Sequence, residues 1–260
     1  MYKQQPIINM DTKKVEFKGA MGESLAAKID YPEGDHTACA LFAHCFTCSK
    51  NLRAVGNIAK ALNKKGVAVF RFDFTGLGDS EGSFEDTNFS SNVEDLVAAS
   101  EYMGKEMSLP TVLIGHSLGG AAVLQAAHKI DSVKAVATIG APSEPKHVEK
   151  HFESKRDEIE EKGSAVVNLG GRPFRIKKQF IDDLEKTRMD KYIENLDRAL
   201  LVMHSPLDDT VGIDNAAHIY KMAKHPKSFL SLHEGDHLLL DENYSRYAGS
   251  IIAEWSSIYL

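Results

Sequence analysis

A serine lies at the centre of the pentapeptide Gly115-His116-Ser117-Leu118-Gly119, between an apolar run and a segment rich in small residues. The pattern G-x-S-x-G, with a strand before it and a helix after it, is typical of a sharp turn that exposes a nucleophilic hydroxyl. The two glycines remove side chains that would collide across such a turn. We therefore predict that Ser117 is a nucleophile. The simpler alternative is a glycine-rich turn whose serine only caps the helix.

A serine hydroxyl needs a base to remove its proton, and a histidine held by a carboxylate can supply that base. In sheets that carry this turn, the acid and then the histidine follow the serine in the chain, each after a later strand. His237 follows the apolar run 228–235, and Asp208 and Asp209 follow the run 199–206. We predict His237 as the base and Asp208 as its partner, with Asp209 as the alternative acid.

Backbone N–H groups near the serine would stabilise an oxyanion that forms during its attack. The helix start after the turn offers the N–H of Leu118, and the loop after an earlier strand offers the N–H of Phe46. Cys45 and Cys48 flank Phe46 as a C-x-x-C pair. We interpret the pair as small side chains that pack a tight loop. A redox pair and, with His44, part of a metal site are the alternatives.

The surrounding sequence alternates between short apolar runs and segments with helical spacing. This alternation predicts the α/β class, with a mostly parallel twisted sheet and helices on both faces. A Met-Gly-Glu turn between two alternating segments predicts an antiparallel hairpin at the N-terminal side. The expected strands are 15–20, 24–32, 37–44, 67–74, 111–117, 133–142, 199–206 and 228–235, and the expected helices are 50–65, 90–105, 118–129, 212–224 and 243–258.

Residues 143–196 break this rhythm, because they separate two expected strands by far more than a usual connection. The segment begins with a strongly charged stretch of helical spacing, and a Gly-Gly pair at 170–171 lies between two short β-prone runs. A further helical stretch covers about 177–195. We predict an inserted lid made of helix, β-hairpin and helix over a site, and a core formed by residues 1–142 and 197–260.

The composition is ordinary for one globular α/β domain, with 260 residues, 43% hydrophobic and 26% charged. A net charge of −6 gives no basic surface for nucleic acid. No apolar run reaches the roughly 18 residues that span a bilayer, and no secretory signal is visible. The three cysteines lie too close together for a disulfide framework. We therefore expect a cytoplasmic monomer or homodimer that binds neither nucleic acid nor membrane.

Taken together, these motifs resemble the α/β-hydrolase superfamily. More narrowly, the segments FAHCFTCSK, RFDFTGLGDSEG, IGHSLGGAAV and VMHSPLDDTVGIDNA are similar to those of a bacterial group of serine hydrolases often fused to a C-terminal OsmC-like domain. The resemblance implies that Cys45 is a trait of this group. We expect the OsmC-like domain to be absent, because the chain ends after its last expected helix, so the resemblance implies no peroxide-reducing role.

The resemblance and the motifs predict a carboxylic ester hydrolase, an esterase that acts on a small-molecule ester through an acyl-enzyme on Ser117. This chemistry requires no metal and no organic cofactor. The hypothesis from a different class is a non-catalytic or redox-sensing binding protein that uses Cys45 and Cys48 on a hydrolase scaffold. Thioesterase and peptidase activity would use the same side chains, and the choice among them depends on the pocket beneath residues 143–196.

Overall fold

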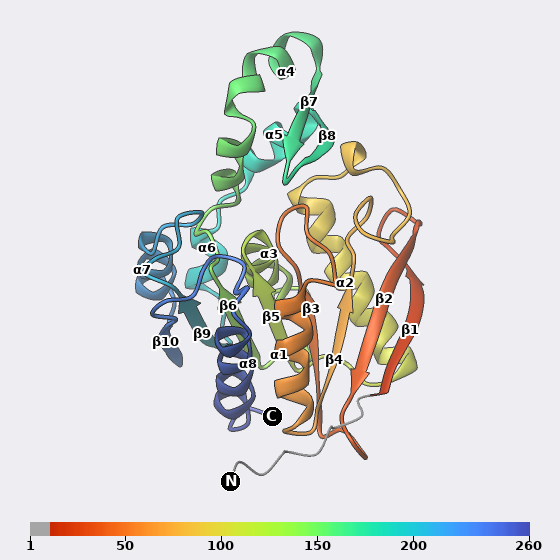
Figure 1. The fold of residues 1–260 in the computed structure, drawn as a ribbon, viewed down its shortest axis with the longest axis vertical. Helices are drawn as coiled ribbons and strands as arrows, with labels where there is room; N and C mark the ends of the chain where they lie inside the picture. The colour runs from red at the N-terminus through yellow and green to blue at the C-terminus, as the bar shows by residue number, and fades with distance from the viewer. Residues whose placement is uncertain (1–10) are drawn as a thin grey trace.

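A computed structural model describes residues 11–260 (Figure 1). The strands of its large sheet are β1 (Asp11–Lys18), β2 (Ser24–Tyr31), β3 (Ala38–Ala43), β4 (Val67–Phe72), β5 (Val112–His116), β6 (Ala135–Ile139), β9 (Ala199–His204) and β10 (Lys227–Ser231). The helices around that sheet are α1 (Arg53–Asn63), α2 (Phe89–Glu106), α3 (Leu118–Ala126), α7 (Asp214–Met222) and α8 (Glu242–Ser256), and the short helix η1 (Phe84–Asp86) precedes α2.

The eight strands lie in the order β1-β2-β4-β3-β5-β6-β9-β10. Every neighbouring pair from β4 to β10 is parallel, whereas β1 pairs antiparallel with β2 and β2 pairs antiparallel with β4. The predicted α/β architecture and its N-terminal antiparallel hairpin are therefore confirmed. No helix among residues 11–260 combines the length and the apolar character needed to cross a membrane.

The central strands divide the core into two layers, because successive side chains of a strand point to opposite faces. In β3, Ala40 and Phe42 pack into the cluster that contains residues of α1 and α8, whereas Leu41 packs with residues of α2 and α3. A strand covered on both faces must be apolar at nearly every position, which explains the continuous apolar runs of the sequence. The parallel strands then end at one edge, where the loops after β3, β5, β9 and β10 meet.

Residues 143–196 leave the core between β6 and β9, and most of them, about 145–186, lie beyond that edge of the sheet (Figure 1). Residues 190–194 return to the side of the core and lie beside α3 and α7. Residues 143–196 form η2 (Pro145–His151), η3 (Glu153–Lys155), α4 (Arg156–Lys162), β7 (Ser164–Leu169), β8 (Arg172–Lys177), α5 (Lys178–Lys186) and α6 (Asp190–Glu194). We call this segment the insertion. β7 and β8 pair antiparallel around Gly170 and Gly171, which both have positive φ.

The helices of the insertion are more broken than the sequence pattern indicates. The first charged stretch is two short 3₁₀ turns followed by α4, because Phe152 leaves the helical conformation and its ring is buried. The second stretch breaks between α5 and α6, where Met189 is buried. Helical spacing in the sequence therefore marked a buried face but missed these interruptions. The assignment of the insertion as a lid stays a prediction.

A close contact between α1 and α8 fixes one side of the core. A Cβ atom on Gly249 of α8 would lie 2.8 Å from the Cβ of Ala61 and 2.8 Å from the Cα of Ile58 in α1. By contrast, a Cβ on Gly56, which is also in α1, meets nothing within 4 Å. Both glycines lie inside a helix, but only Gly249 lacks the space for a methyl group.

We expect Gly249→Ala to destabilise the protein by about 1–3 kcal/mol, because the added methyl group forces the helices apart. Gly56→Ala is the matched control and should stabilise it by about 0.5–1 kcal/mol, because alanine loses less conformational entropy in a helix. Urea unfolding of both variants measures the two free energies. A destabilisation of equal size in both variants would show that the helix contact is not tight.

Candidate active site

The strand-to-helix turn at the end of β5 places Ser117 in a strained backbone conformation, with φ 54° and ψ −126°. Its N–H donates to the carbonyl of Ile139 at 2.8 Å, which ties the turn to β6. A Cβ on Gly115 would lie 2.3 Å from the carbonyl oxygen of Gly119, and one on Gly119 would lie 2.5 Å from the carbonyl oxygen of His44. Only glycine fits at these two positions, so the hydroxyl is held at the edge of the sheet.

The structure brings Ser117, His237 and Asp208 together from three separate loops. The Oγ of Ser117 lies 3.0 Å from the Nε2 of His237, and the Nδ1 of His237 lies 2.8 Å from the Oδ2 of Asp208. Ser117 and Asp208 are buried, and the His237 side chain is 10% exposed. The three groups thus form a continuous line of hydrogen bonds, with the chain order of serine, acid and histidine that the sequence predicts.

The choice between the two aspartates follows from backbone hydrogen bonds in the loop after β9. The Oδ1 of Asp208 accepts the N–H groups of Thr210 at 2.9 Å and Val211 at 2.8 Å, while its Oδ2 faces His237. Asp209 is exposed, and the one hydrogen bond of its side chain within residues 11–260 comes from the hydroxyl of Thr210 at 3.2 Å. Burial alone would raise the pKa of Asp208, but the hydrogen bonds from His237, Val211 and Thr210 outweigh burial and hold this pKa below its usual value.

Leu118 and Phe46 carry the two backbone N–H groups that the sequence predicts as oxyanion donors, a role that stays a prediction. Leu118 begins α3, where the first N–H groups of a helix have no partner within the helix. Phe46 lies in the loop after β3, and its N–H donates to no other group within residues 11–260. Phe46 and Leu118 are therefore both available to a negatively charged oxygen next to Ser117.

A buried ion pair anchors the far end of the Phe46 loop. The backbone N–H and the Nζ of Lys50 each donate to a different oxygen of Asp73 at 2.5 Å, and the Nζ also contacts Asp79 at 2.7 Å. Arg71 donates to the Lys50 carbonyl at 2.5 Å and pairs with the buried carboxylate of Asp30. These fixed charges hold the loop against β4.

Two further histidines, His116 and His204, hold the loops of the site. The Nε2 of His116 lies 2.6 Å from the carbonyl of His237, and the Nε2 of His204 lies 2.7 Å from the carbonyl of Val211. A carbonyl only accepts, so both Nε2 atoms carry the proton. Burial is the main cause that lowers the pKa of His116 to about 3. In the sequence, these roles were indicated only by position: His116 directly precedes Ser117, and His204 directly precedes the loop that carries Asp208.

A cavity of about 380 Å³ opens above Ser117 and His237. Its walls come from the core loops and from the insertion, and its lining residues are Cys45, Phe46, Thr47, Cys48, Ser117, Pro142, His147, Val148, His151, Asn168, Leu169, Gly170, Thr210, Val211, His237 and Leu238. None of these residues is acidic. A cavity of this size with mixed polar and apolar walls suits a small molecule.

The insertion touches both loops that build the site. The Nε2 of His147 lies 2.8 Å from the carbonyl of Thr210, and the Nζ of Lys150 donates to the same carbonyl. On the other side, a guanidinium N–H of Arg172 donates to the carbonyl of Thr47 at 2.6 Å. The ring of Phe46 also contacts the ring of Phe180 from α5, with ring centroids 5.9 Å apart. The insertion therefore contacts both the loop after β9, which carries Asp208, and the loop after β3, which carries Phe46.

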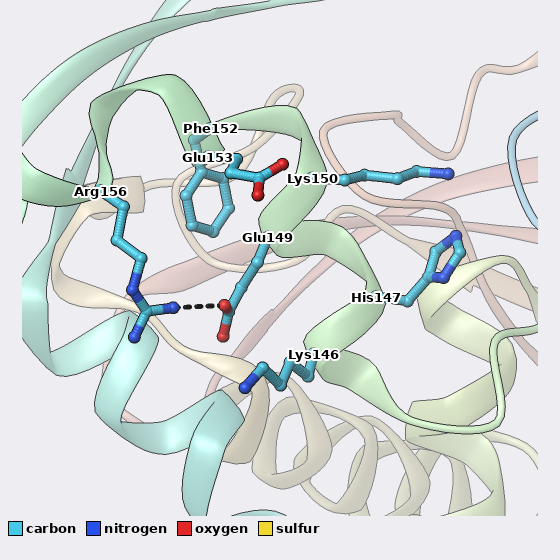
Figure 2. Close-up of a pocket in the computed structure, with 7 residues that line it drawn as sticks. All are labelled: Lys146, His147, Glu149, Lys150, Phe152, Glu153 and Arg156. Atoms are coloured by element: carbon cyan, nitrogen blue, oxygen red, sulfur yellow. Dashed lines mark hydrogen bonds and ion pairs between the residues drawn. The ribbon is translucent and has the colours of Figure 1, made fainter.

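A second cavity of about 290 Å³ lies along η2 (Figure 2). Glu149 and Arg156 form an ion pair on one side of η2, whereas His147 and Lys150 point to the opposite side, toward the Thr210 loop. This cavity contains neither Ser117 nor His237. Of these two cavities, the one above Ser117 can place a molecule beside Ser117 and His237.

Cys45 and Cys48 are joined by a disulfide. The two residues are therefore bonded within the tight loop that they were expected to pack, and a redox role for the pair stays a prediction. The physical reason is the tight turn at residues 45–48, which brings the two Cα atoms to 5.3 Å, within the usual range for a disulfide. Cys39 remains a free thiol and is buried. Among residues 11–260, no group of three or more histidine, cysteine or acidic side chains is arranged to hold a metal ion.

The chain is 47% identical to the esterase domain of a Rhodothermus marinus protein, with a TM-score of 0.78 over 96% of this chain and 99% of that one. The profile of the serine aminopeptidase S33 family matches residues 37–156. The chain belongs to the α/β-hydrolase superfamily. No curated protein sequence matches this hydrolase.

More distant structures share the fold of this hydrolase. Est1E from Butyrivibrio proteoclasticus, in its complex with ferulic acid, is 20% identical with a TM-score of 0.79 over 94% of this chain and 99% of that one. The mouse α/β hydrolase domain-containing protein 10 is 20% identical with a TM-score of 0.75 over 94% of this chain and 98% of that one. At this level of identity the likeness concerns the fold.

The buried His116 makes the stability of the hydrolase depend on pH in a defined direction. Its pKa is about 3 in the folded protein and about 6.5 in an unfolded chain. Between these values the unfolded chain binds a proton that the folded protein excludes, so stability falls as the pH is lowered from about 6.5 toward 3. The contribution of one such group is at most about 1.4 kcal/mol per pH unit.

We therefore expect His116→Gln to flatten the fall in the free energy of unfolding between pH 7 and pH 5, compared with the unsubstituted protein. Urea unfolding at several pH values measures both slopes. The other buried histidines remain in both proteins, so the difference between the slopes reports His116 alone. Two parallel slopes would mean that His116 takes up a proton in the folded state.

Proposed function

We propose that this hydrolase is a serine esterase that cleaves small carboxylic esters. The hydrogen-bonded line of Ser117, His237 and Asp208 beneath a small-molecule cavity carries the proposal. The 47% identity to an esterase domain supports the ester as the bond that is cleaved. No metal or organic cofactor takes part in the proposed reaction.

In the proposed mechanism, His237 removes the proton of Ser117 as its Oγ attacks the carbonyl carbon of the ester. Asp208 keeps the Nδ1 proton of His237 in place and stabilises the imidazolium that forms. The N–H groups of Phe46 and Leu118 donate to the developing oxyanion. His237 then protonates the leaving alcohol, and water resolves the acyl-enzyme by the same steps in reverse.

The lining of the cavity favours an ester over an amino-terminal peptide. An aminopeptidase must hold the ammonium group of its substrate, and an acidic side chain is the usual partner for such a cation. The cavity above Ser117 has no acidic residue in its lining. We therefore propose a neutral ester as the substrate, although the family profile carries the name of a peptidase.

The alternative function, a non-catalytic or redox-sensing binding protein, has one observation in its favour. The Cys45–Cys48 disulfide lines the same cavity as Ser117. A purely binding role would leave the contacts of His237 with Ser117 and Asp208 without a purpose. We therefore place any redox role of the cysteines within a working hydrolase rather than instead of one.

The main test labels the purified protein with a fluorophosphonate and locates the label by mass spectrometry. We expect the label on Ser117, turnover of p-nitrophenyl acetate and butyrate, and much slower turnover of aminoacyl p-nitroanilides. Ser117→Ala should lower kcat by several orders of magnitude, because it removes the nucleophile itself. Retention of most of the activity in Ser117→Ala would overturn the proposal.

The two neighbouring aspartates provide a matched pair of variants. Asp208→Asn should lower kcat by about 10⁴-fold, because an amide stabilises the wrong tautomer of His237. Asp209→Asn should change kcat less than about twofold, because Asp209 is exposed and does not face His237. Circular dichroism controls for folding, and equal losses in both variants would contradict the assignment of Asp208.

A further inference from the structure

The direction of the Phe46 N–H depends on what holds the carbonyl of Cys45. The two groups belong to one peptide unit, and in a trans peptide the C=O and the N–H point in opposite directions. The carbonyl of Cys45 lies 2.8 Å from the Nδ1 of His44 and accepts the N–H of Cys48 at 3.1 Å. Two bonds on the carbonyl side therefore aim the N–H of Phe46 to the other side, where the oxyanion would lie.

His44 is suited to this task because it is buried and neutral. Its side chain is 1% exposed, and burial is the main cause that lowers its pKa. Its Nε2 lies 3.4 Å from the N–H of Phe74 and accepts it, so its Nδ1 carries the proton and donates to the carbonyl of Cys45. This bond is therefore independent of pH in the ordinary range.

The second bond closes a turn that its own residues disfavour. In the turn of residues 45–48, Thr47 has a φ of 59°, in the left-handed region. A β-branched residue rarely adopts this conformation, and glycine is usual at that position of such a turn. Something other than local preference must therefore hold the turn. The disulfide between Cys45 and Cys48 joins its first and last residues directly.

We propose that the Cys45–Cys48 disulfide is a thiol-reactive site whose oxidation state controls the oxyanion hole, the pair of N–H groups of Phe46 and Leu118. This inference rests on the proposed function, because these donors matter only if Ser117 attacks an ester. Both cysteines line the cavity, and Cys48 is half-buried whereas Cys45 is buried. The chemical class that the site accepts is thus a small thiol or dithiol that enters through the cavity.

A dithiol reductant can reduce the Cys45–Cys48 disulfide by thiol–disulfide exchange without any further reactant. A thiolate of the reductant attacks the Sγ of Cys48, the S–S bond breaks, and its electron pair leaves with the Sγ of Cys45. The second thiol of the reductant then attacks the mixed disulfide and releases Cys48. The reductant departs as a disulfide, and its two protons end on the two cysteine thiols.

Reduction frees Thr47 to leave its left-handed conformation, and the bond from the N–H of Cys48 to the carbonyl of Cys45 is lost with the turn. The bonds from His44 to Cys45 and from Arg172 to Thr47 remain. The hole is therefore loosened rather than removed. Loss of one complete donor costs about 10²–10³ in kcat, so loosening it should cost about tenfold to a hundredfold.

The test measures kcat and KM for p-nitrophenyl butyrate in the oxidised protein, after reduction with dithiothreitol, and after reoxidation. We expect kcat to fall about tenfold or more on reduction with a much smaller change in KM, and to recover on reoxidation. The affinity for a trifluoromethyl ketone, which forms an oxyanion on Ser117, should fall with kcat, whereas the affinity for the product acid should not. Thiol titration counts the cysteines released.

Cysteine variants separate this site from other effects of the reductant. Cys39→Ala should keep the full response, because Cys39 is buried and burial raises the pKa of its thiol to about 11. The double variant Cys45→Ser with Cys48→Ser should have the low kcat of the reduced protein with or without dithiothreitol. A second pair, His44→Asn and His44→Leu, tests the carbonyl bond with the disulfide intact. The asparagine can still donate to Cys45, so it should retain more of kcat than the leucine.

An equal kcat in the oxidised and reduced proteins, with two thiols released and the fold retained, would overturn the inference. Failure of the proposed function itself looks different, because Ser117→Ala would then stay active in the oxidised protein. If reduction unfolds the protein in a thermal melt, the His44 pair decides the matter. Equal kcat in these two variants would then contradict the claim that the bond from His44 to the carbonyl of Cys45 orients the N–H of Phe46.

Discussion

Backbone must lie directly against backbone where α3 meets the loop after β3, and the site is built around this contact. Gly119 leaves no side chain between the helix and the carbonyls of Ala43 and His44. The loop that carries Phe46 therefore approaches the start of α3, and Phe46 and Ser117 line one cavity. With any larger residue at position 119, this loop would stand away from Ser117.

The sequence predicted the fold because its signals are local, and it also named Ser117, Asp208 and His237, which the structure brings within hydrogen-bonding distance of one another. Continuous apolar runs indicated the buried strands, and G-x-S-x-G before a helix located Ser117. The choice of Asp208 could not be derived, since it depends on which carboxylate receives the N–H groups of Thr210 and Val211. The interruptions of the insertion at Phe152 and Met189 were missed because helical spacing reports the buried face and not the continuity of the helix.

The cysteines and histidines were harder to interpret because their roles depend on three-dimensional neighbours. A C-x-x-C pair can pack, bind a metal or form a bond, and only the turn at Thr47 brings the sulfurs together. His44, His116 and His204 each lie close to a backbone carbonyl. Buried neutral histidines thus serve here as rigid backbone braces, a use that the residue type alone does not announce.

The insertion reaches two backbone carbonyls on opposite sides of the serine, that of Thr47 through Arg172 and that of Thr210 through His147 and Lys150. A segment attached in this way is not an interchangeable module. Grafting onto this core an insertion that lacks counterparts of Arg172, His147 and Lys150 would carry a new pocket wall but leave both carbonyls without their donors. Point changes elsewhere in the insertion would alter the pocket wall and keep these donors in place.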